Sequence, residues 1–398
     1  MPVNIPLTLG LIATAGIAMR WLASRIGIPV VAAYLLTGAL LGPLGIGVIG
    51  AADLAGLLPA TAIVSAFTLF MVGRELQIGR LRAEGRTPLT TALGEGSATF
   101  LAVSIASYLV TGSPIVSLAL GATATPTAPA TVMIVLHQYT PRGPLTRLLR
   151  STVALDDVLA TAAGAVVISI AGWFTVGEFG AGEFGAAYLL VVPVVGAGGG
   201  ALLAYLLPHF RDYGHRSALV IGIVLAFLGL QALSPIAPQV AALVAGFVLV
   251  NQLRYSRAFW HKFEEFLDFV YLVFFVYLGA HLQPDLILGA PLLLGAYILA
   301  RGLGKGIGAT VGCACTGLNI RTGAYLGIAL MPQGTLSLVL AAMAEKIYPA
   351  SDGLILNIVL ASTLFFEAIG PFGTALAIRH YRETHDINRR SGAPPATR

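Results

Sequence analysis

The chain is divided into thirteen apolar segments, separated by polar loops too short to hold a folded domain. The hydrocarbon core of a bilayer is about 30 Å thick, and an α-helix crosses it in about 20 residues. Without water, each crossing segment must satisfy its own backbone hydrogen bonds, which favours helices. The pattern therefore predicts an all-α polytopic membrane protein of about thirteen transmembrane helices. The segments are roughly 5–23, 28–46, 59–73, 88–110, 115–137, 147–173, 185–207, 217–232, 236–251, 263–281, 287–313, 321–345 and 353–378.

The charge content agrees with this class. Only 10% of the residues are charged and 57% are hydrophobic, whereas a soluble domain carries about 25% charged residues. The first apolar segment has no basic region before it and no small-residue cleavage site after it, so we expect no cleavable signal. Residues 383–398 have the composition of a disordered tail, and the membrane domain is expected to occupy residues 1–382.

The basic residues predict an orientation. If the N-terminus lies outside the cell, 20 of the 23 Lys and Arg residues fall in cytoplasmic loops or the tail. Only Lys346 falls outside, and two others lie within a segment. This is the positive-inside pattern of the cell inner (plasma) membrane. An odd number of spans places the C-terminus in the cytoplasm. The net charge of +5 is thus a topology signal, and we expect lipid rather than nucleic acid as the partner.

Two halves of the chain repeat at an offset of 206 residues. LFMVGRELQ, containing Gly73, matches FFVYLGAHLQ, containing Gly279, and the same offset relates Pro126 to Pro332. Six spans repeat after a seventh that links them, so the second copy is inverted in the membrane. Inverted repeats are typical of secondary transporters. The offset also aligns Pro29 with Pro235, Glu95 with Arg301, and Asp156-Asp157 with Ser362-Thr363.

The fifth and twelfth segments are interrupted near their middles. One contains GATATPTAPATV with Pro126 and Pro129, and the other contains LMPQGTLS with Pro332 and Gly334. Proline removes a backbone donor and clashes with the preceding turn, so both helices should break there. Broken backbone survives at membrane depth only inside the protein or beside a water-filled cavity. Equivalent breaks in two inverted halves predict crossed, discontinuous helices 5 and 12 around a midplane site.

Threonines surround the first break. The hydroxyl oxygens of Thr123, Thr125 and Thr127 are suited to a small cation. The alternative is a pair of proline kinks whose threonine hydroxyls bond their own helix.

Two adjacent acids lie in the middle of the sixth segment, within LLRSTVALDDVLATAAGAVV. Asp157 follows Arg147 by ten residues, so it sits roughly 15 Å along the helix axis, near the bilayer centre. Intramembrane acids are usually functional and face a cavity or a partner. Consecutive helix residues point about 100° apart, so Asp156 and Asp157 cannot share one partner face. We expect one aspartate to pair with Lys305 and the other to face the cavity. As coupled carboxylates they would bind protons and a hard monovalent cation at the same oxygens.

Three further charges lie within membrane segments. Arg301 comes one turn before Lys305, and Glu95 and Glu367 are candidate counter-ions for it. We interpret Glu95, Arg301 and Glu367 as a structural charge network that holds helices together.

Several of these runs together resemble one family. Residues 121–157, the IPVVAAYLLTGALLGP opening of the second segment and the R-x-x-x-K of the eleventh are similar to the monovalent cation:proton antiporter-2 family. The resemblance covers about residues 10–380. It implies a sodium/proton antiporter fold and a homodimer, with transported ions and no cofactor. Many relatives carry a C-terminal nucleotide-binding regulatory domain, and we expect none to be attached to this chain.

The resemblance also implies domains and roles. A mobile core would comprise about 88–173 and 287–378, and a dimerisation scaffold about 5–73 and 185–281. Asp157 would bind the cation and the proton, Asp156 would be its neighbour, and Lys305 would pair with Asp156. Thr125 would lie near the ion. The Asp-Asp form resembles the electrogenic branch. The family often carries Arg where Gln333 stands, so no role for that Arg is carried over.

The sequence therefore predicts a secondary antiporter, not an enzyme, that exchanges protons for sodium or lithium by elevator-type alternating access. A potassium/proton antiporter on the same fold is the closest alternative, and a cation channel or sensor is a more remote one. An intramembrane aspartyl protease is disfavoured, because its aspartates lie on two facing helices and this chain has no Gly-Asp pair.

Overall fold

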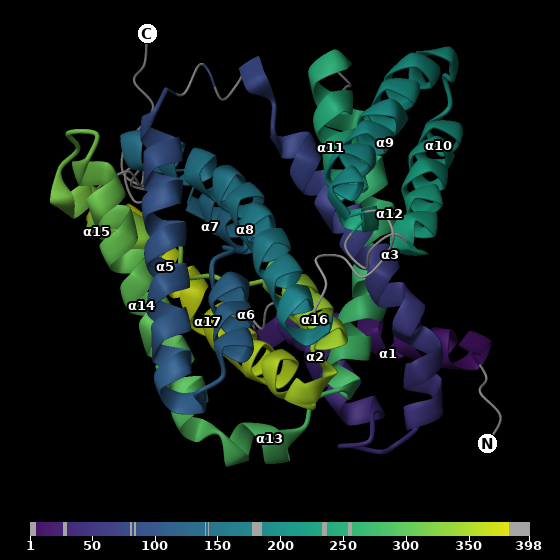
Figure 1. Ribbon diagram of the computed structural model, residues 1–398, viewed down its shortest axis with the longest axis horizontal. Coiled ribbons are helices and arrows are strands. Elements are labelled where there is room, and N and C mark those ends of the chain that lie inside the picture. Colours follow the sequence, from purple (N-terminus) through teal and green to yellow (C-terminus); the bar gives the residue numbers. More distant parts are fainter. Residues whose placement is uncertain are drawn as a thin grey trace, which may run out of the picture.

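The computed structural model describes residues 5–26, 30–79, 82, 85–139, 141, 143–176, 185–232, 237–253 and 257–381, and the elements of regular structure in this part of the chain are all helices (Figure 1). In these described ranges they group into thirteen units that correspond to the predicted segments, and two of the units are broken pairs. The predicted tail, 383–398, lies outside the described residues. The spans are α1 (Ile5–Ile26), α2 (Val30–Leu41), α3 (Ala51–Glu75), α5 (Thr87–Thr111), α6 with α7 (Pro114–Ala124, Pro129–Tyr139), α8 (Pro144–Val176), α9 (Gly185–Leu206), α10 with the 3₁₀ turn η2 (Tyr213–Phe227, Leu228–Ala232), α11 (Ala237–Gln252), α12 (Arg257–Ala280), α14 (Pro291–Ala314), α15 with α16 (Ile320–Ala329, Thr335–Ile347) and α17 (Leu354–His380).

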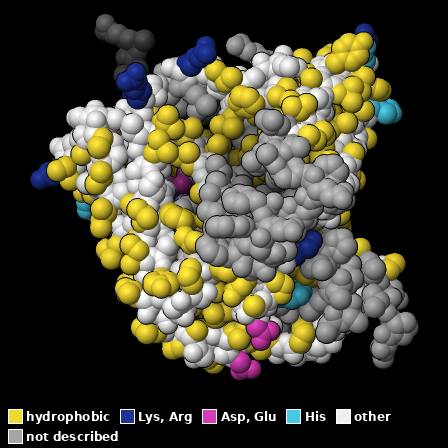
Figure 2. Space-filling view, viewed as in Figure 1, with side chains coloured by type: hydrophobic (Ala, Val, Ile, Leu, Met, Phe, Trp, Pro, Cys, Tyr) yellow, Lys and Arg dark blue, Asp and Glu magenta, His cyan; other side chains and the backbone are white. Residues whose placement is uncertain are grey.

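The helices have the apolar surface of a membrane protein. Within the described ranges, six helices are long and apolar enough to cross a bilayer by length and composition alone. The remaining spans are shorter, broken or interrupted by charge. Figure 2 shows hydrophobic side chains spread over much of the described part of one face, whereas most of the charged side chains in view lie near its edges. A surface so rich in apolar side chains matches a polytopic membrane protein. One short separate helix, α13 (Pro284–Gly289), covers the end of a predicted loop and the start of the predicted segment 287–313.

Equivalent glycines mark the inverted repeat. Gly73 of α3 packs against the backbone of Leu243 in α11, and a β-carbon there would overlap the Leu243 carbonyl. Gly279 of α12 packs in the same way against Leu35 of α2. The α3–α11 crossing is therefore repeated, 206 residues later, by the α12–α2 crossing. This is the offset that the sequence predicts for the two halves.

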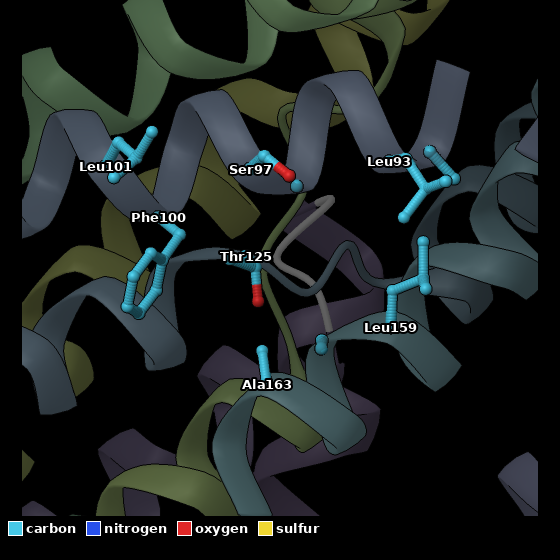
Figure 3. A pocket seen from close by; sticks show the side chains of 10 residues that line it. Leu93, Ser97, Phe100, Leu101, Thr125, Leu159 and Ala163 are labelled. Carbon is cyan, nitrogen blue, oxygen red and sulfur yellow. The ribbon is translucent and has the colours of Figure 1, made fainter. Parts of the chain in front are cut away.

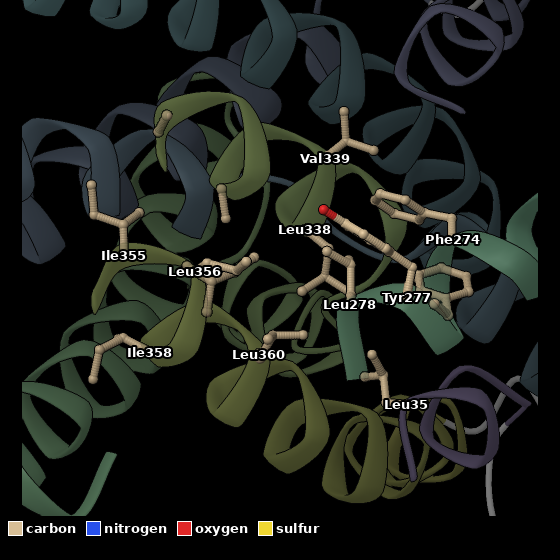
Figure 4. Packing of buried hydrophobic residues seen from close by; sticks show 14 of the residues in the cluster. Leu35, Phe274, Tyr277, Leu278, Leu338, Val339, Ile355, Leu356, Ile358 and Leu360 are labelled. Carbon is tan, nitrogen blue, oxygen red and sulfur yellow. The ribbon is translucent and has the colours of Figure 1, made fainter. Parts of the chain in front are cut away.

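The spans gather into two groups that meet along an apolar interface. Helices α5 to α8 and α14 to α17 pack on one side. Helix α3 packs with α9 to α12 on the other, where α1 and α2 lie against α12 (Figure 1). Between them, Leu35, Tyr277 and Leu278 pack with Leu338 and Leu360 in one buried cluster (Figure 4). The division into a mobile core and a dimerisation scaffold stays a prediction.

Helices α5 and α14 pack backbone to backbone. Gly304, Gly308 and Gly312, one per turn of α14, lie against the main chain of α5 at Thr99, Glu95 and Thr91 respectively. Small residues at such spacing let two helices approach more closely than larger side chains would allow. This close packing places the functional groups of α14 directly beside Glu95.

Replacing Gly308 by alanine is expected to lower stability by about 1–3 kcal/mol, because the new methyl group overpacks a tight contact. The β-carbon would collide with Glu95 and Gly94 backbone atoms. Gly306→Ala is the matched control, because a β-carbon at Gly306 meets open space. Thermal melting of the two variants in detergent measures the difference, and equal melting temperatures would contradict the packing argument.

Candidate ion-exchange site at the helix crossing

Two interrupted helices cross in the centre of the molecule. Helix α6 ends at Ala124, residues 125–128 are non-helical, and Pro129 opens α7. The second interruption separates α15 from α16. The Ala128 amide donates to the Pro332 carbonyl across the crossing, at 3.0 Å. A β-carbon on Gly334 would come 2.9 Å from that of Ala128, which explains glycine there. The crossed breaks predicted from Pro126, Pro129, Pro332 and Gly334 are confirmed.

Arg301 fastens the ends of both interrupted helices. Its guanidinium donates to carbonyls of both non-helical segments at the crossing and stacks over the Phe366 ring at 4.3 Å. Helix C-terminal carbonyls have no intrahelical partner, and arginine supplies several donors in a rigid fork. The four acceptors are Ala124 at 2.9 Å, Met331 at 2.7 Å, Pro126 at 3.0 Å and Pro332 at 3.3 Å.

Glu95 and Glu367, the predicted counter-ions of Arg301, make their direct contacts elsewhere. In the part of the chain that the structure describes, no ion pair joins Arg301 to Glu95 or Glu367. Glu367 instead accepts bonds from the Thr131 hydroxyl, 3.0 Å from each oxygen. Arg301 reaches carbonyls rather than carboxylates, because the half-helix ends lie directly beside it.

Lys305, one turn further along α14, lies at the centre of the charged cluster. Its side chain is fully buried. The ammonium lies 3.0 Å from Asp156 Oδ2 and 3.0 Å from Glu95 Oε2. It also donates to the Thr127 hydroxyl at 2.9 Å and to the Thr125 carbonyl. The structure thus brings Lys305 together with Asp156, and adds Glu95 as a second carboxylate.

Asp156 and Asp157 face different neighbours, as their helical spacing requires. Asp156 is fully buried and its Oδ2 also accepts the Thr127 hydroxyl at 2.6 Å. Asp157 is 5% exposed. Ala160 and Gly164 continue its side of α8, where Ala160 belongs to a buried cluster with Leu69 of α3 and residues of α16. Asp157 therefore points toward the seam between the two groups of helices.

Thr125 lies at the helix break, where its carbonyl accepts a hydrogen bond from Lys305. Its hydroxyl donates to the Ala122 carbonyl at 2.9 Å, within its own helix end. The side chain faces a cavity of about 350 Å³ between α5 and α8, with Ser97 and Leu159 also on its wall (Figure 3). Thr127, two residues on, is the threonine that bonds Asp156. The two hydroxyls therefore have different partners, Ala122 for Thr125 and Asp156 for Thr127.

Gln333 occupies the position in the second half that corresponds to Thr127 in the first. Its amide donates to the Tyr297 hydroxyl at 2.9 Å, and its oxygen accepts the Ser362 hydroxyl at 3.3 Å. Subtracting 206 from Gln333 and Ser362 gives Thr127 and Asp156. The polar contact at the first break is therefore repeated at the second without a charge.

The Glu95–Lys305 contact was not predicted from the sequence. The sequence carries a signal for it, because glycines four residues apart in the eleventh segment predict a close helix neighbour. That signal does not say which helix is the neighbour.

Crossed broken helices, an inverted repeat and buried charges near mid-depth define a secondary ion transporter. The chain belongs to the sodium/hydrogen exchanger family, since the model of the transmembrane sodium/hydrogen exchanger matches residues 10–377. This family comprises cation/proton antiporters, so the protein is a transporter rather than an enzyme.

Solved structures show the same fold. The sodium proton antiporter MjNhaP1 from Methanocaldococcus jannaschii at pH 8 has a TM-score of 0.70 and 20% identity, over 94% of this chain and 95% of that one. An electron-microscopy map of the same antiporter has a TM-score of 0.64 and 19% identity, over 94% of each chain. No curated protein matches the chain.

Proposed function

We propose that the protein exchanges protons for sodium or lithium ions, and that the cation and the proton compete at Asp157. The supporting observation is the unequal setting of the two acids. Asp156 is engaged by Lys305 and Thr127, whereas Asp157 lies on the side of α8 that meets the other group of helices. An acid at this boundary can exchange its ligand when the boundary opens.

The exchange is proposed to be electrogenic. Two acids that each release a proton for one bound cation move one net charge per cycle. Lys305 contributes as the ammonium that faces Asp156 once its proton has left to make room for the cation, since an opposite charge nearby favours the charged form.

The motion is proposed to be of the elevator type. The core, 88–173 and 287–378, would slide against a scaffold of 5–73 and 185–281 that forms a homodimer. The apolar contacts between the groups support this, because dispersion contacts are individually weak and non-directional. The N-terminus would lie outside the cell and the C-terminus in the cytoplasm.

The test of the activity is purified protein in vesicles that contain a pH-sensitive dye. Sodium and lithium are each expected to collapse an imposed pH gradient, and potassium is expected to have little effect. A response to potassium alone would favour the potassium/proton alternative. Flux that neither saturates nor couples the two ions would favour a channel.

Replacing Lys305 by glutamine is expected to make the exchange electroneutral. Without the ammonium at 3.0 Å, Asp156 would hold its proton throughout the cycle, so that one proton exchanges for one cation. Stimulation by a membrane potential would then disappear, as measured with a potassium gradient and valinomycin. Lys346→Gln, at an exposed helix end, is the control. Unchanged voltage dependence in the Lys305 variant would refute the assigned role.

A further inference from the structure

Lys305 has two carboxylate partners of equal distance, and they belong to different helices. Its ammonium lies 3.0 Å from Glu95 Oε2 on α5 and 3.0 Å from Asp156 Oδ2 on α8. All three side chains are fully buried. The three donors of the ammonium are shared among the two carboxylates, the Thr127 hydroxyl and the Thr125 carbonyl. Lys305 therefore does not depend on Asp156 alone for its neutralisation.

The two carboxylates are held in different ways. Glu95 faces Lys305 across the glycine-spaced contact of α5 and α14, where Gly304 and Gly308 lie against the α5 main chain. Asp156 reaches Lys305 from a separate helix, and its Oδ2 is shared with the Thr127 hydroxyl. The Glu95–Lys305 distance is thus set by a tight backbone contact, whereas the Asp156 contact depends on how α8 sits beside the crossing.

Other charges do not replace Glu95 in this task. Arg301 is engaged with four carbonyls, and Glu367 accepts from Thr131. Removing one partner of a buried ion pair is costly, because it leaves an uncompensated charge. If Asp156 were the sole counter-ion, every cation or proton that took Asp156 would strand the Lys305 ammonium.

We propose that Glu95 is the permanent counter-ion of Lys305, which leaves Asp156 able to exchange its ammonium partner for a transported ion. This inference rests on the proposed antiport. It makes Glu95 a positioning residue that acts through Lys305, rather than a ligand of the ion.

The test is the cation dependence of Glu95→Gln in vesicles. With Glu95 neutral, the ammonium attracts Asp156 alone, so the cation must compete harder for the site. Coupling energies of close charge pairs exceed about 1.5 kcal/mol, so the KM for the cation should rise about tenfold, with kcat unchanged. Asp285→Asn removes an exposed carboxylate from α13 and is expected to leave KM unchanged.

A double-mutant cycle with Lys305→Gln identifies the partner. In the Lys305→Gln background, adding Glu95→Gln is expected to leave KM unchanged, because the ammonium that Glu95 neutralises is gone. An unchanged KM in Glu95→Gln alone would overturn the inference, and so would an equal rise in both backgrounds. Wild-type protein without cation-driven proton flux would instead contradict the proposed function.

Folding supplies a second measurement. Should Glu95→Gln fail to give a monodisperse protein in detergent, Glu95→Gln combined with Lys305→Gln is expected to restore it, because the unpaired ammonium is removed. A double variant no better than the single one would overturn the pairing.

Discussion

Replacing Asp157 by asparagine abolishes cation-driven proton exchange, down to the level of empty vesicles, if Asp157 is the exchange site. Asparagine keeps the size of the side chain and removes its charge and its proton. Asp156 alone does not replace it, because Asp156 faces Lys305 and Thr127 on another side of α8, away from the seam where Asp157 lies. Dye-reported pH changes in vesicles under a sodium gradient measure the loss.

The loss of exchange is assigned to the site only if the Asp157→Asn variant folds like the wild type. Asp157 lies 5% exposed at the seam of the two helix groups, and the asparagine variant is expected to elute and melt like the wild type. Asp285→Asn serves as the control for the loss of a carboxylate. Sodium-dependent flux that survives in Asp157→Asn would show that the cation and the proton meet elsewhere.

Replacing Arg301 by alanine has the second large effect, and it acts on assembly rather than on exchange. The carbonyls of Ala124, Pro126 and Met331 would lose this donor, and each unsatisfied buried group costs about 1–3 kcal/mol. The Pro332 carbonyl would keep the Ala128 amide. In the membrane interior no water replaces the missing donors. We expect most of the protein to aggregate when extracted in detergent.

Size-exclusion profiles and melting curves measure the effect on assembly. Arg321→Ala, an exposed arginine on α15, removes the same side chain away from the crossing and should melt like the wild type. A melting temperature of Arg301→Ala within a few degrees of the wild type would show that the crossing does not need its arginine.

Most of the fold is predictable from local features. The spans follow from the length of the apolar segments, because the bilayer sets a minimum length for a crossing helix. The polar loops between the segments mark their ends. The breaks follow from Pro126 and Pro332, because proline cannot complete the helix ladder wherever it lies. The repeat follows from an offset that many weak matches share. Helix α13 was missed, because its six residues are too few to produce a periodic signal.

The site is less predictable, because sequence shows which charges are buried but not which atoms they reach. Arg301 and Lys305 lie four residues apart, so both point to one side of α14. From the sequence alone, Glu95 could form an ion pair with either of them. The structure gives Glu95 to Lys305, since Gly308 brings the α5 main chain against that turn. In the same way, Thr125 and Thr127 are equivalent in composition, and only the course of the broken backbone decides which one bonds Asp156.

The glycine contact between α5 and α14 also has a mechanical consequence. Side-chain interfaces can relax by changing rotamers, but Gly304, Gly308 and Gly312 leave main chain against main chain. Close-packed interiors are stiff and transmit strain. We therefore expect α5 and α14 to move together as one rigid body. Spin labels at the ends of α5 and α14 would then keep a constant spacing while labels on other helix pairs change theirs.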